Sequence, residues 1–387
     1  MRDHLSTSVA TVSRRGIVQT LLGALAAAPA LVQAAAPPRG RGDPVAGAPR
    51  SADELLASLG DGVFINANES PLGPCPAARA QLARIPSIAG RYGMSFAADL
   101  EALFASQNGL KPENVTAHPG SYVPLRHAAL TYASDARPLA YCTPTFDSGF
   151  FGADNQSIVR TITIPHDKQH RIDVRALLAA APNAGAYYLC NPNNPTGLVT
   201  SPEDIAWLLA NKPADAKLII DEAYIHFSDA PSAIDLVRQG KDVIVLRTFS
   251  KIYGLAGLRC GLVVARKDLL EPMKRYGVNV MPMAAVVAAQ ASLADPELLP
   301  MRKAYNARVR DDLYAFFERL KLEYIPSRAS FAMVNVGRPG TEVAAKLAEQ
   351  RIHVSRQRGN MVNWIRVSFG TPDEMAAFKA AFERMMA

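Results

Sequence analysis

Short runs of β-branched and aromatic residues alternate with helical patterns through the middle of this chain, and this alternation limits the possible folds more than any other feature. Extended segments are predicted at 114–117, 139–142, 159–164, 186–190, 217–220, 243–247 and 261–265. Helical segments are predicted among them, at 98–107, 121–132, 147–152 and 202–210. Strands that are joined by helices usually form a parallel sheet covered on both faces. The sequence therefore predicts an α/β fold with a mainly parallel, doubly wound sheet.

The C-terminal part of the chain has a different pattern. After about residue 296 the sequence predicts a long helix to residue 320, extended pieces near Phe331 and Arg366, and a last helix from Asp373. We interpret residues 291–387 as a smaller α/β domain, to which residues 51–74 add an N-terminal segment. Residues 75–290 then form the predicted large domain.

The first fifty residues are interpreted as an address and not as part of the fold. The twin arginines Arg14 and Arg15 stand just before an apolar stretch at 17–32, and small residues at Ala34 and Ala36 offer a peptidase site. This arrangement resembles a twin-arginine export signal. We predict a signal over residues 1–36 that directs the chain through the twin-arginine (Tat) export machinery to the periplasm.

A membrane anchor is the alternative interpretation of the same stretch. The stretch is rich in alanine, is interrupted by Gln19 and Pro29, and falls short of the roughly 20 strongly apolar residues that a span needs. We expect cleavage near Ala34 to Ala36 and no stable membrane association afterwards, with tethering by an uncleaved signal as the alternative. Residues 37–50 are rich in Pro, Gly and Arg and are predicted to be a linker.

Charge and cysteine usage argue against several classes of protein. The formal net charge is +7, but the basic residues are scattered, so we expect no nucleic-acid partner. The cysteines are far apart and form no metal-ligand spacing, so we predict no metal site and no disulfide framework. They are interpreted as small buried apolar residues, at Cys75, Cys142, Cys190 and Cys260.

Polar residues follow several of the predicted strands. An Asn-Asn-Pro-Thr-Gly run at 193–197 follows one strand, Asp221 ends the next, and Ser250 and Lys251 follow the third. In open α/β sheets, ligands bind beyond the carboxyl ends of the strands. We therefore expect these side chains to meet in one site.

The residue types at these positions match what pyridoxal phosphate (PLP) requires of a protein. The cofactor needs a lysine amine, an acid facing its ring nitrogen, donors to its phenolic oxygen and ligands for its phosphate. Lys251, Asp221, Tyr224 and Arg259 supply these groups in that order. Taken singly, such residues are often a solvated lysine or a helix N-cap, but together they predict a PLP enzyme in which Lys251 also carries a proton.

The motifs together resemble the fold-type I aminotransferases of the class I/II group, from about residue 64 to the C-terminus. The branch that they resemble most is histidinol-phosphate aminotransferase, which has similar motifs at positions corresponding to 65–74 and 255–261. The resemblance implies a PLP-dependent transaminase that moves the amino group of an amino acid to a 2-oxo acid. It implies Lys251, Asp221 and Tyr224 as the catalytic residues.

The same resemblance implies the cofactor ligands. Asn194 and Tyr224 would hold the phenolic oxygen, and Phe146 would stack on the ring. The phosphate would be bound by Gly120, Ser121, Thr248, Ser250 and Arg259.

Further residues are implied at the subunit interface and on the substrate side. Tyr92 matches a tyrosine that reaches the cofactor phosphate of a partner subunit, which implies a homodimer with shared active sites. Arg366 would hold the substrate α-carboxylate, and Asn68 and Arg356 are the other predicted substrate-binding residues. Arg358 is an alternative to Arg356 for a distal anion.

Two features leave the reaction open. An export signal is not typical of a biosynthetic enzyme, and Tyr122 stands after Ser121 where this branch usually has an acidic or small polar residue. An exported PLP-dependent oxidase or desaturase of the same fold is the alternative, in which His118 and His127 would assist, although structural roles for both histidines are the simpler interpretation. A binding protein that has lost catalysis is a third possibility, but it would be expected to have lost the lysine or the aspartate.

Overall fold

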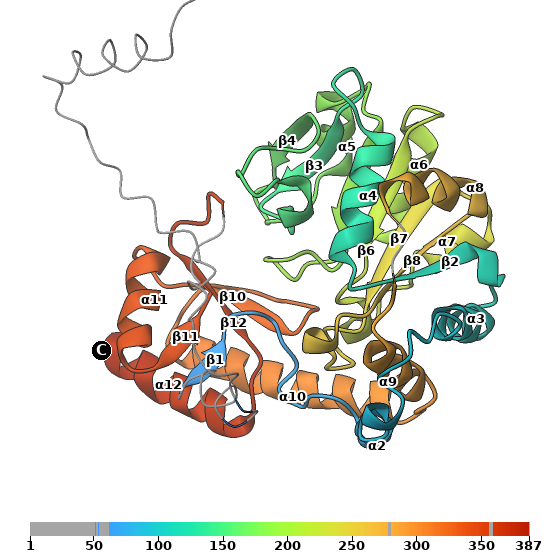
Figure 1. The fold of residues 1–387 in the computed structure, drawn as a ribbon. Helices are drawn as coiled ribbons and strands as arrows, with labels where there is room; N and C mark the ends of the chain where they lie inside the picture. Colours follow the sequence, from blue (N-terminus) through green and yellow to red (C-terminus); the bar gives the residue numbers. More distant parts are fainter. Residues whose placement is uncertain (1–50, 52, 54–61, 278–279, 356–358, 387) are drawn as a thin grey trace, which may run out of the picture. The chain divides into compact units, whose positions relative to one another are not determined.

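A computed structural model describes residues 51, 53, 62–277, 280–355 and 359–386 of the chain (Figure 1). The contacts divide the chain into two units, Met1–Gly60 and Asp61–Ala387. The predicted signal and linker, and also Arg356 and Arg358, lie outside the described residues. Within the part that is described, no helix combines the length and the apolar character needed to cross a membrane.

The main sheet has seven strands in the order β2-β8-β7-β6-β5-β3-β4. β8 pairs antiparallel with both of its neighbours, β2 and β7, and the other neighbouring strands are parallel. The predicted α/β fold with a mainly parallel sheet is therefore confirmed. The strands are β2 (Val115–His118), β3 (Leu139–Thr143), β4 (Thr161–Pro165), β5 (Ala186–Cys190), β6 (Lys217–Asp221), β7 (Val243–Thr248) and β8 (Gly261–Ala265).

Helices cover both faces of this sheet because its central strands are apolar on both sides. Along β6, Leu218 and Ile220 belong to one hydrophobic cluster, while Ile219 between them belongs to another. This alternation follows from the two-residue period of a strand. The helices of this part are α2 (Pro76–Leu82), α3 (Phe96–Gln107), α4 (Tyr122–Tyr132), α5 (Val174–Ala180), α6 (Pro202–Asn211), α7 (Ile234–Arg238), α8 (Lys267–Leu270) and α9 (Met283–Leu293).

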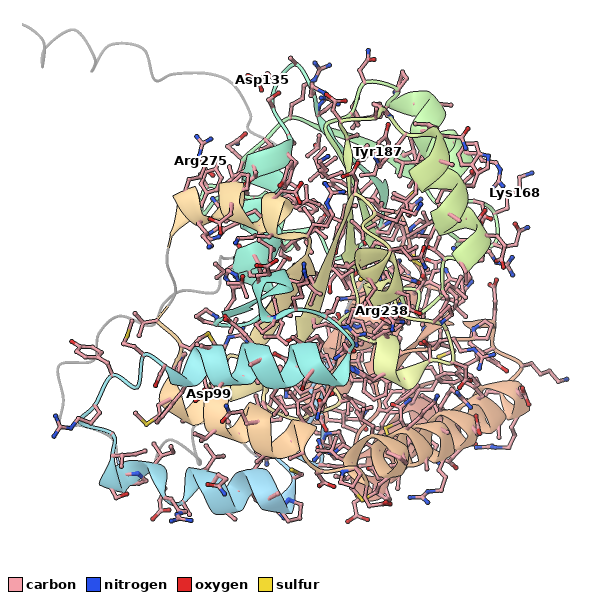
Figure 2. The ribbon with its side chains drawn as sticks, turned by 90° about the vertical axis from the view of Figure 1, so that its right-hand side faces the viewer. Asp99, Asp135, Lys168, Tyr187, Arg238 and Arg275 are labelled. Carbon is pink, nitrogen blue, oxygen red and sulfur yellow. The ribbon has the colours of Figure 1, made fainter. Side chains whose placement is uncertain are left out.

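Apolar and aromatic side chains are buried around this sheet, and many charged side chains are exposed. Tyr187, on β5, is fully buried, and its hydroxyl donates to the carbonyl of Ala181 at 2.6 Å. Figure 2 shows the exposed charged residues Lys168 and Arg275 at the outer edge of the view, and the exposed Asp99 on α3. The apolar period of the strands therefore sets which residues form the core.

The C-terminal elements form a second group with its own core. Phe317, Val334, Val367 and Phe378 belong to this core, and Ile65 joins it from the N-terminal side. Figure 1 shows β1, in blue, beside the orange and red C-terminal elements. The elements are β1 (Val63–Ile65), paired parallel with β11 (Ile352–Val354), the antiparallel sheet β12 (Trp364–Ser368), β10 (Phe331–Asn335) and β9 (Tyr324–Ile325), and α10 (Leu298–Arg319), α11 (Gly340–Glu349) and α12 (Pro372–Met386).

Some elements differ from the sequence prediction. The helix predicted at 147–152 is only a 3-10 turn, Ser148–Phe150. Helix α9 was not predicted, because its sequence is largely apolar, with only Gln290 and Ser292 polar, and has no 3.6-residue period. The exact limits of the two predicted domains stay a prediction.

Candidate active site

The predicted site residues converge because of strand direction. Asp221 is the last residue of β6, and Asn194 and Lys251 follow the carboxyl ends of its parallel neighbours β5 and β7. β8 runs the other way, and its first residue, Gly261, pairs with His118 at the end of β2 and with Thr248 at the end of β7. Arg259, just before β8, therefore lies at the same edge of the sheet.

The Lys251 amine is bound by two backbone carbonyl oxygens and lies near an aromatic ring. Its Nζ donates to the carbonyl oxygens of Asn68 at 3.1 Å and Ala67 at 3.3 Å, and lies 5.6 Å from the centre of the Tyr224 ring. Burial, helped by the positive charge of Arg366, lowers the pKa of Lys251 to about 8. The amine is consequently neutral in a larger fraction of molecules near neutral pH than an exposed lysine would be.

Asp221 is a buried carboxyl group, and the effect of burial outweighs that of the neighbours that favour its charge. Its Oδ1 accepts from the backbone N–H of Ala223 at 3.0 Å, and the Tyr188 hydroxyl lies 3.5 Å from Oδ2. Burial raises the pKa of Asp221 to about 6. A cationic ring nitrogen beside this carboxyl would favour its ionised form, so Asp221 fits the predicted partner of the PLP ring.

Asn68 links Tyr224 to strand β12. Its Nδ2 donates to the Tyr224 hydroxyl oxygen at 3.0 Å, and its Oδ1 accepts from the Ser368 hydroxyl at 2.9 Å. Its backbone N–H also donates to Ser368 at 2.9 Å, and its φ of 56° is left-handed, a conformation that asparagine tolerates. Asn68, predicted as a substrate ligand, therefore holds Tyr224 in place, and its contact with substrate stays a prediction.

Arg366 lies in the middle of β12 and is buried. Its Nη1 donates to the Asn194 side-chain oxygen at 2.6 Å, and its Nη2 donates to the Asn66 carbonyl at 2.7 Å. Both oxygens are neutral, and they orient the guanidinium beside the predicted cofactor ligand Asn194. A substrate carboxylate would meet a cation that is already positioned.

The predicted phosphate ligands also lie together. The Thr248 hydroxyl donates to Ser250 at 3.0 Å, and the Arg259 Nη1 donates to the same Ser250 oxygen at 3.3 Å. Gly120 has a φ of +86°, and a Cβ at this position would overlap the Arg259 guanidinium. Ser121 is the N-cap of α4, where backbone N–H groups favour an anion. Hydroxyls, a guanidinium and a helix start fit a phosphate group.

The remaining predicted residues lie around this centre. Phe146 follows β3, and its carbonyl accepts from the Tyr188 hydroxyl at 2.8 Å. Tyr92 is 82% exposed. The rings of His118 and His127 meet edge to face at 6.0 Å, and burial lowers the pKa of His118 to about 4, so this histidine is neutral at pH 7.

Two residues of this site were missed in the sequence. Ser368 holds Asn68, and Tyr188 lies beside Asp221. Ser368 could have been found, because it follows Arg366 by two residues in a strand and so faces the same side. Tyr188 carries no such pattern, because it resembles any other core residue of a buried strand.

The sequence of this chain is similar to those of known proteins over most of its length. Residues 61–382 match the family model for aminotransferase class I and II. The chain is 32% identical over 349 residues to histidinol-phosphate aminotransferase from Moorella thermoacetica, which covers 87% of this chain and 89% of that protein. It is 34% identical over 339 residues to histidinol-phosphate aminotransferase 2 from Ralstonia nicotianae, which covers 84% and 89%.

Solved structures show the same likeness. The crystal structure of histidinol-phosphate aminotransferase from Sinorhizobium meliloti, in complex with pyridoxal-5'-phosphate, matches with a TM-score of 0.76 and 26% identity. The match covers 87% of this chain and 95% of that one. Residues 61–382, which match the family model, include every described residue of the candidate site.

The lowered pKa of Lys251 leads to a testable pH dependence. Only the neutral amine can bond to PLP, so the rate of covalent cofactor uptake by the apoprotein should rise with pH and level off above about 8. The rate would be followed by absorbance between pH 6 and 10. A rate that is independent of pH over this range would contradict the assignment.

Two charge-neutralising variants should move this midpoint in opposite directions. Arg366→Gln removes a cation that lowers the pKa of Lys251, so the midpoint should rise. Glu69→Gln removes an anion that raises the pKa of Lys251, so the midpoint should fall. Shifts of the same sign in both variants would mean that the midpoint belongs to another group.

Proposed function

The chain belongs to the aminotransferase class I and II family and is a PLP-dependent transaminase, and on that premise we propose that its amino donor is an α-amino acid held by Arg366. The acceptor would be a 2-oxo acid, whose carboxylate the same guanidinium would hold. The observation that supports this proposal is the buried Arg366, with both Nη atoms oriented by the neutral oxygens of Asn194 and Asn66. The relatives named above support a reaction of the histidinol-phosphate aminotransferase type.

The residues of the site divide the work of holding the cofactor. Asp221 would face the ring nitrogen, Tyr224 and Asn194 the phenolic oxygen, and Arg259 with its neighbouring hydroxyls the phosphate. Bound PLP supplies an electron sink that makes the α-proton of a bound amino acid acidic. The buried Asp221 carboxylate would stabilise positive charge at the ring nitrogen, because little water competes for it.

Lys251 is the group that moves the proton. With a pKa of about 8, its Nζ can accept a proton near neutral pH and release it again. The carbonyl oxygens of Ala67 and Asn68 hold this nitrogen on one side of the site. The Tyr224 ring lies beside it, with its centre 5.6 Å from Nζ.

Replacement of Arg366 tests how the substrate is held. Arg366→Lys keeps the charge but loses the planar fork that binds a carboxylate through two parallel hydrogen bonds. We expect kcat/KM for amino acids to fall about 10- to 150-fold, which corresponds to about 1.5–3 kcal/mol for hydrogen bonds to a charged group. Transamination would be measured over a panel of amino acids and 2-oxo acids.

Three controls make the result specific. Arg175→Lys changes an exposed arginine paired with Asp204 and should leave turnover unchanged. Lys251→Ala should have no turnover, and amines without a carboxylate should be indifferent to Arg366→Lys. Oxygen uptake and peroxide are measured in parallel, because their appearance with every donor would favour the oxidase alternative. Wild-type efficiency of Arg366→Lys, or loss of PLP, would remove Arg366 as the carboxylate ligand.

A homodimer with shared sites is the second part of the proposal. Tyr92 and Met94 are 82% and 64% exposed, which is unusual for such large apolar side chains. Gly93 between them packs close to Met283 at the start of α9, near the exposed Val280. These neighbouring apolar residues support an interface through which Tyr92 would reach the phosphate site of a second copy.

Complementation between two inactive variants tests the shared site. Tyr92→Ala keeps Lys251, and Lys251→Ala keeps Tyr92, so a mixed dimer should contain one site with both residues. We expect co-expressed, differently tagged chains purified through both tags to have clearly more activity than either parent. Activity no higher than the parents, or elution of the wild-type chain as a monomer, would contradict the shared dimer.

Export is the third part, and it rests on the sequence of residues 1–36 alone. Replacement of both Arg14 and Arg15 by lysine removes the guanidinium pair that the twin-arginine machinery recognises. We expect the variant to remain in the cytoplasm with its signal uncleaved, as measured by fractionation and mass of the purified chain. Unchanged recovery from the periplasm would eliminate the twin-arginine interpretation.

A further inference from the structure

Arg302 is a buried cation on α10 that the reaction described above does not use. It is 4% exposed, and burial lowers its pKa below the usual value for arginine. Its Nη1 donates to the carbonyl of Ile252 at 2.7 Å, and its Nη2 donates to the carbonyl of Gly73 at 2.5 Å. One guanidinium therefore joins a helix to two loops that are distant in sequence.

The first of these loops carries Lys251. Ile252 is the next residue in the chain, and the backbone N–H of Gly254 donates to the Lys251 carbonyl at 3.0 Å, which closes a tight turn. Gly254 has a φ of +69°, and a Cβ there would overlap the Gly73 carbonyl and lie 2.9 Å from the Arg302 Nη1. The two loops and the guanidinium are thus packed in direct contact.

The second loop carries the acceptors of the Lys251 amine. Residues 67 and 68 supply the two carbonyl oxygens to which Lys251 Nζ donates, and Gly73 lies at the end of the same segment. The backbone N–H of Gly73 donates to the Ser70 carbonyl at 3.3 Å, so this end is a turn. Arg302 consequently holds both sides of the contact between Lys251 and the 67–73 segment.

The other end of this segment is held separately. Asn66 accepts from Arg366, and Asn68 binds Ser368 and Tyr224. Those contacts attach the segment to β12 and to the loop after β6, but they do not reach the loop after Lys251. Arg302 makes that connection.

Burial of the Arg302 guanidinium is unfavourable in free energy, so its position calls for a specific role. Removing a guanidinium from water is unfavourable unless hydrogen bonds replace the lost hydration. An apolar residue on this face of α10 would avoid the cost, but it could not bind two carbonyl oxygens in a fixed geometry. The fork of the guanidinium suits two acceptors that come from different loops.

We propose that Arg302 is a positioning residue for Lys251, which sets the distance between the lysine amine and the reacting carbon by tying the Ile252 loop to the Gly73 loop. The proposal rests on Lys251 as the proton-transferring lysine of the transaminase. Proton transfer is sensitive to such placement, because a displacement of about 1 Å can slow a reaction about 100-fold. In this proposal Arg302 acts through Lys251 and not by contact with substrate or cofactor.

The test follows a single half-reaction of the holoenzyme by the absorbance of its bound PLP. The amino acid is supplied with hydrogen or deuterium at the α-carbon, so the isotope-sensitive rate constant identifies proton transfer. Arg302→Met keeps most of the length and the apolar contacts but removes both donors, and Arg302→Lys keeps a donor for one carbonyl. The dependence of the rate on amino-acid concentration gives the binding constant separately.

In Arg302→Met we expect the isotope-sensitive rate constant to fall about 10- to 100-fold. The binding constant of the amino acid should change less than about threefold, because Arg366 is untouched. Arg302→Lys should lie between Arg302→Met and wild type. A purely structural role would lower the melting temperature without separating proton transfer from binding.

Two variants on the same helix are matched controls. Arg319→Met removes an exposed guanidinium that pairs with Glu383, and Val309→Ala removes buried methyl groups of the C-terminal core. Both should keep the wild-type rate of proton transfer, even where Val309→Ala lowers the melting temperature.

A folded Arg302→Met holoenzyme with the wild-type isotope-sensitive rate overturns the proposal, and so does an equal loss in Val309→Ala. If Arg302→Met does not fold, Arg302→Lys decides, because an unchanged rate there also overturns it. Retained turnover in Lys251→Ala would instead refute the role of the lysine, so the two failures are distinguishable.

Discussion

The rest of the site depends on one constraint, which is the direction of the strands in the main sheet. Their directions decide which loops meet at one edge of the sheet. Parallel strands bring Asn194, Asp221 and Lys251 to one edge, and the reversed strand β8 brings Arg259 to it from the opposite direction. A parallel β8 would place its preceding loop at the other edge of the sheet. The single change of strand direction therefore brings Arg259 to the proposed phosphate site.

Burial changes the pKa values of the acidic and basic groups at this edge. Burial raises the pKa of Asp221 and lowers the pKa of Lys251, so both groups are nearer to neutral than they would be in water. The positive charges of Arg366 and Arg259 push the pKa of Lys251 in the same direction. A cofactor with a basic ring nitrogen and an anionic phosphate would supply the opposite charges at both ends. The family relationship and the electrostatics therefore point to the same group.

The segment from Asn66 to Gly73 connects the two hydrophobic cores at the site. Its beginning is bound to β12 through Arg366 and Ser368, which lie about 300 residues further along the chain. Its end is bound to α10 through Arg302. The lysine amine donates to carbonyl oxygens of the same segment, so Arg366 and Lys251 bind one piece of backbone.

The sequence by itself determined the fold class, most strand positions and the type of chemistry, because these depend on local periods and on motifs of a few residues. The strands at 186–190 and 261–265 have the predicted limits, whereas the largely apolar α9 and the short turn at 148–150 carry no distinctive period. Only the tertiary structure decided that Asn68 binds Tyr224 and Ser368, and that Arg302 binds Ile252 and Gly73. The reason is physical. The period of a helix or strand indicates which face each of its residues occupies. The partners of that residue depend on which distant loops the packing of the two cores brings together.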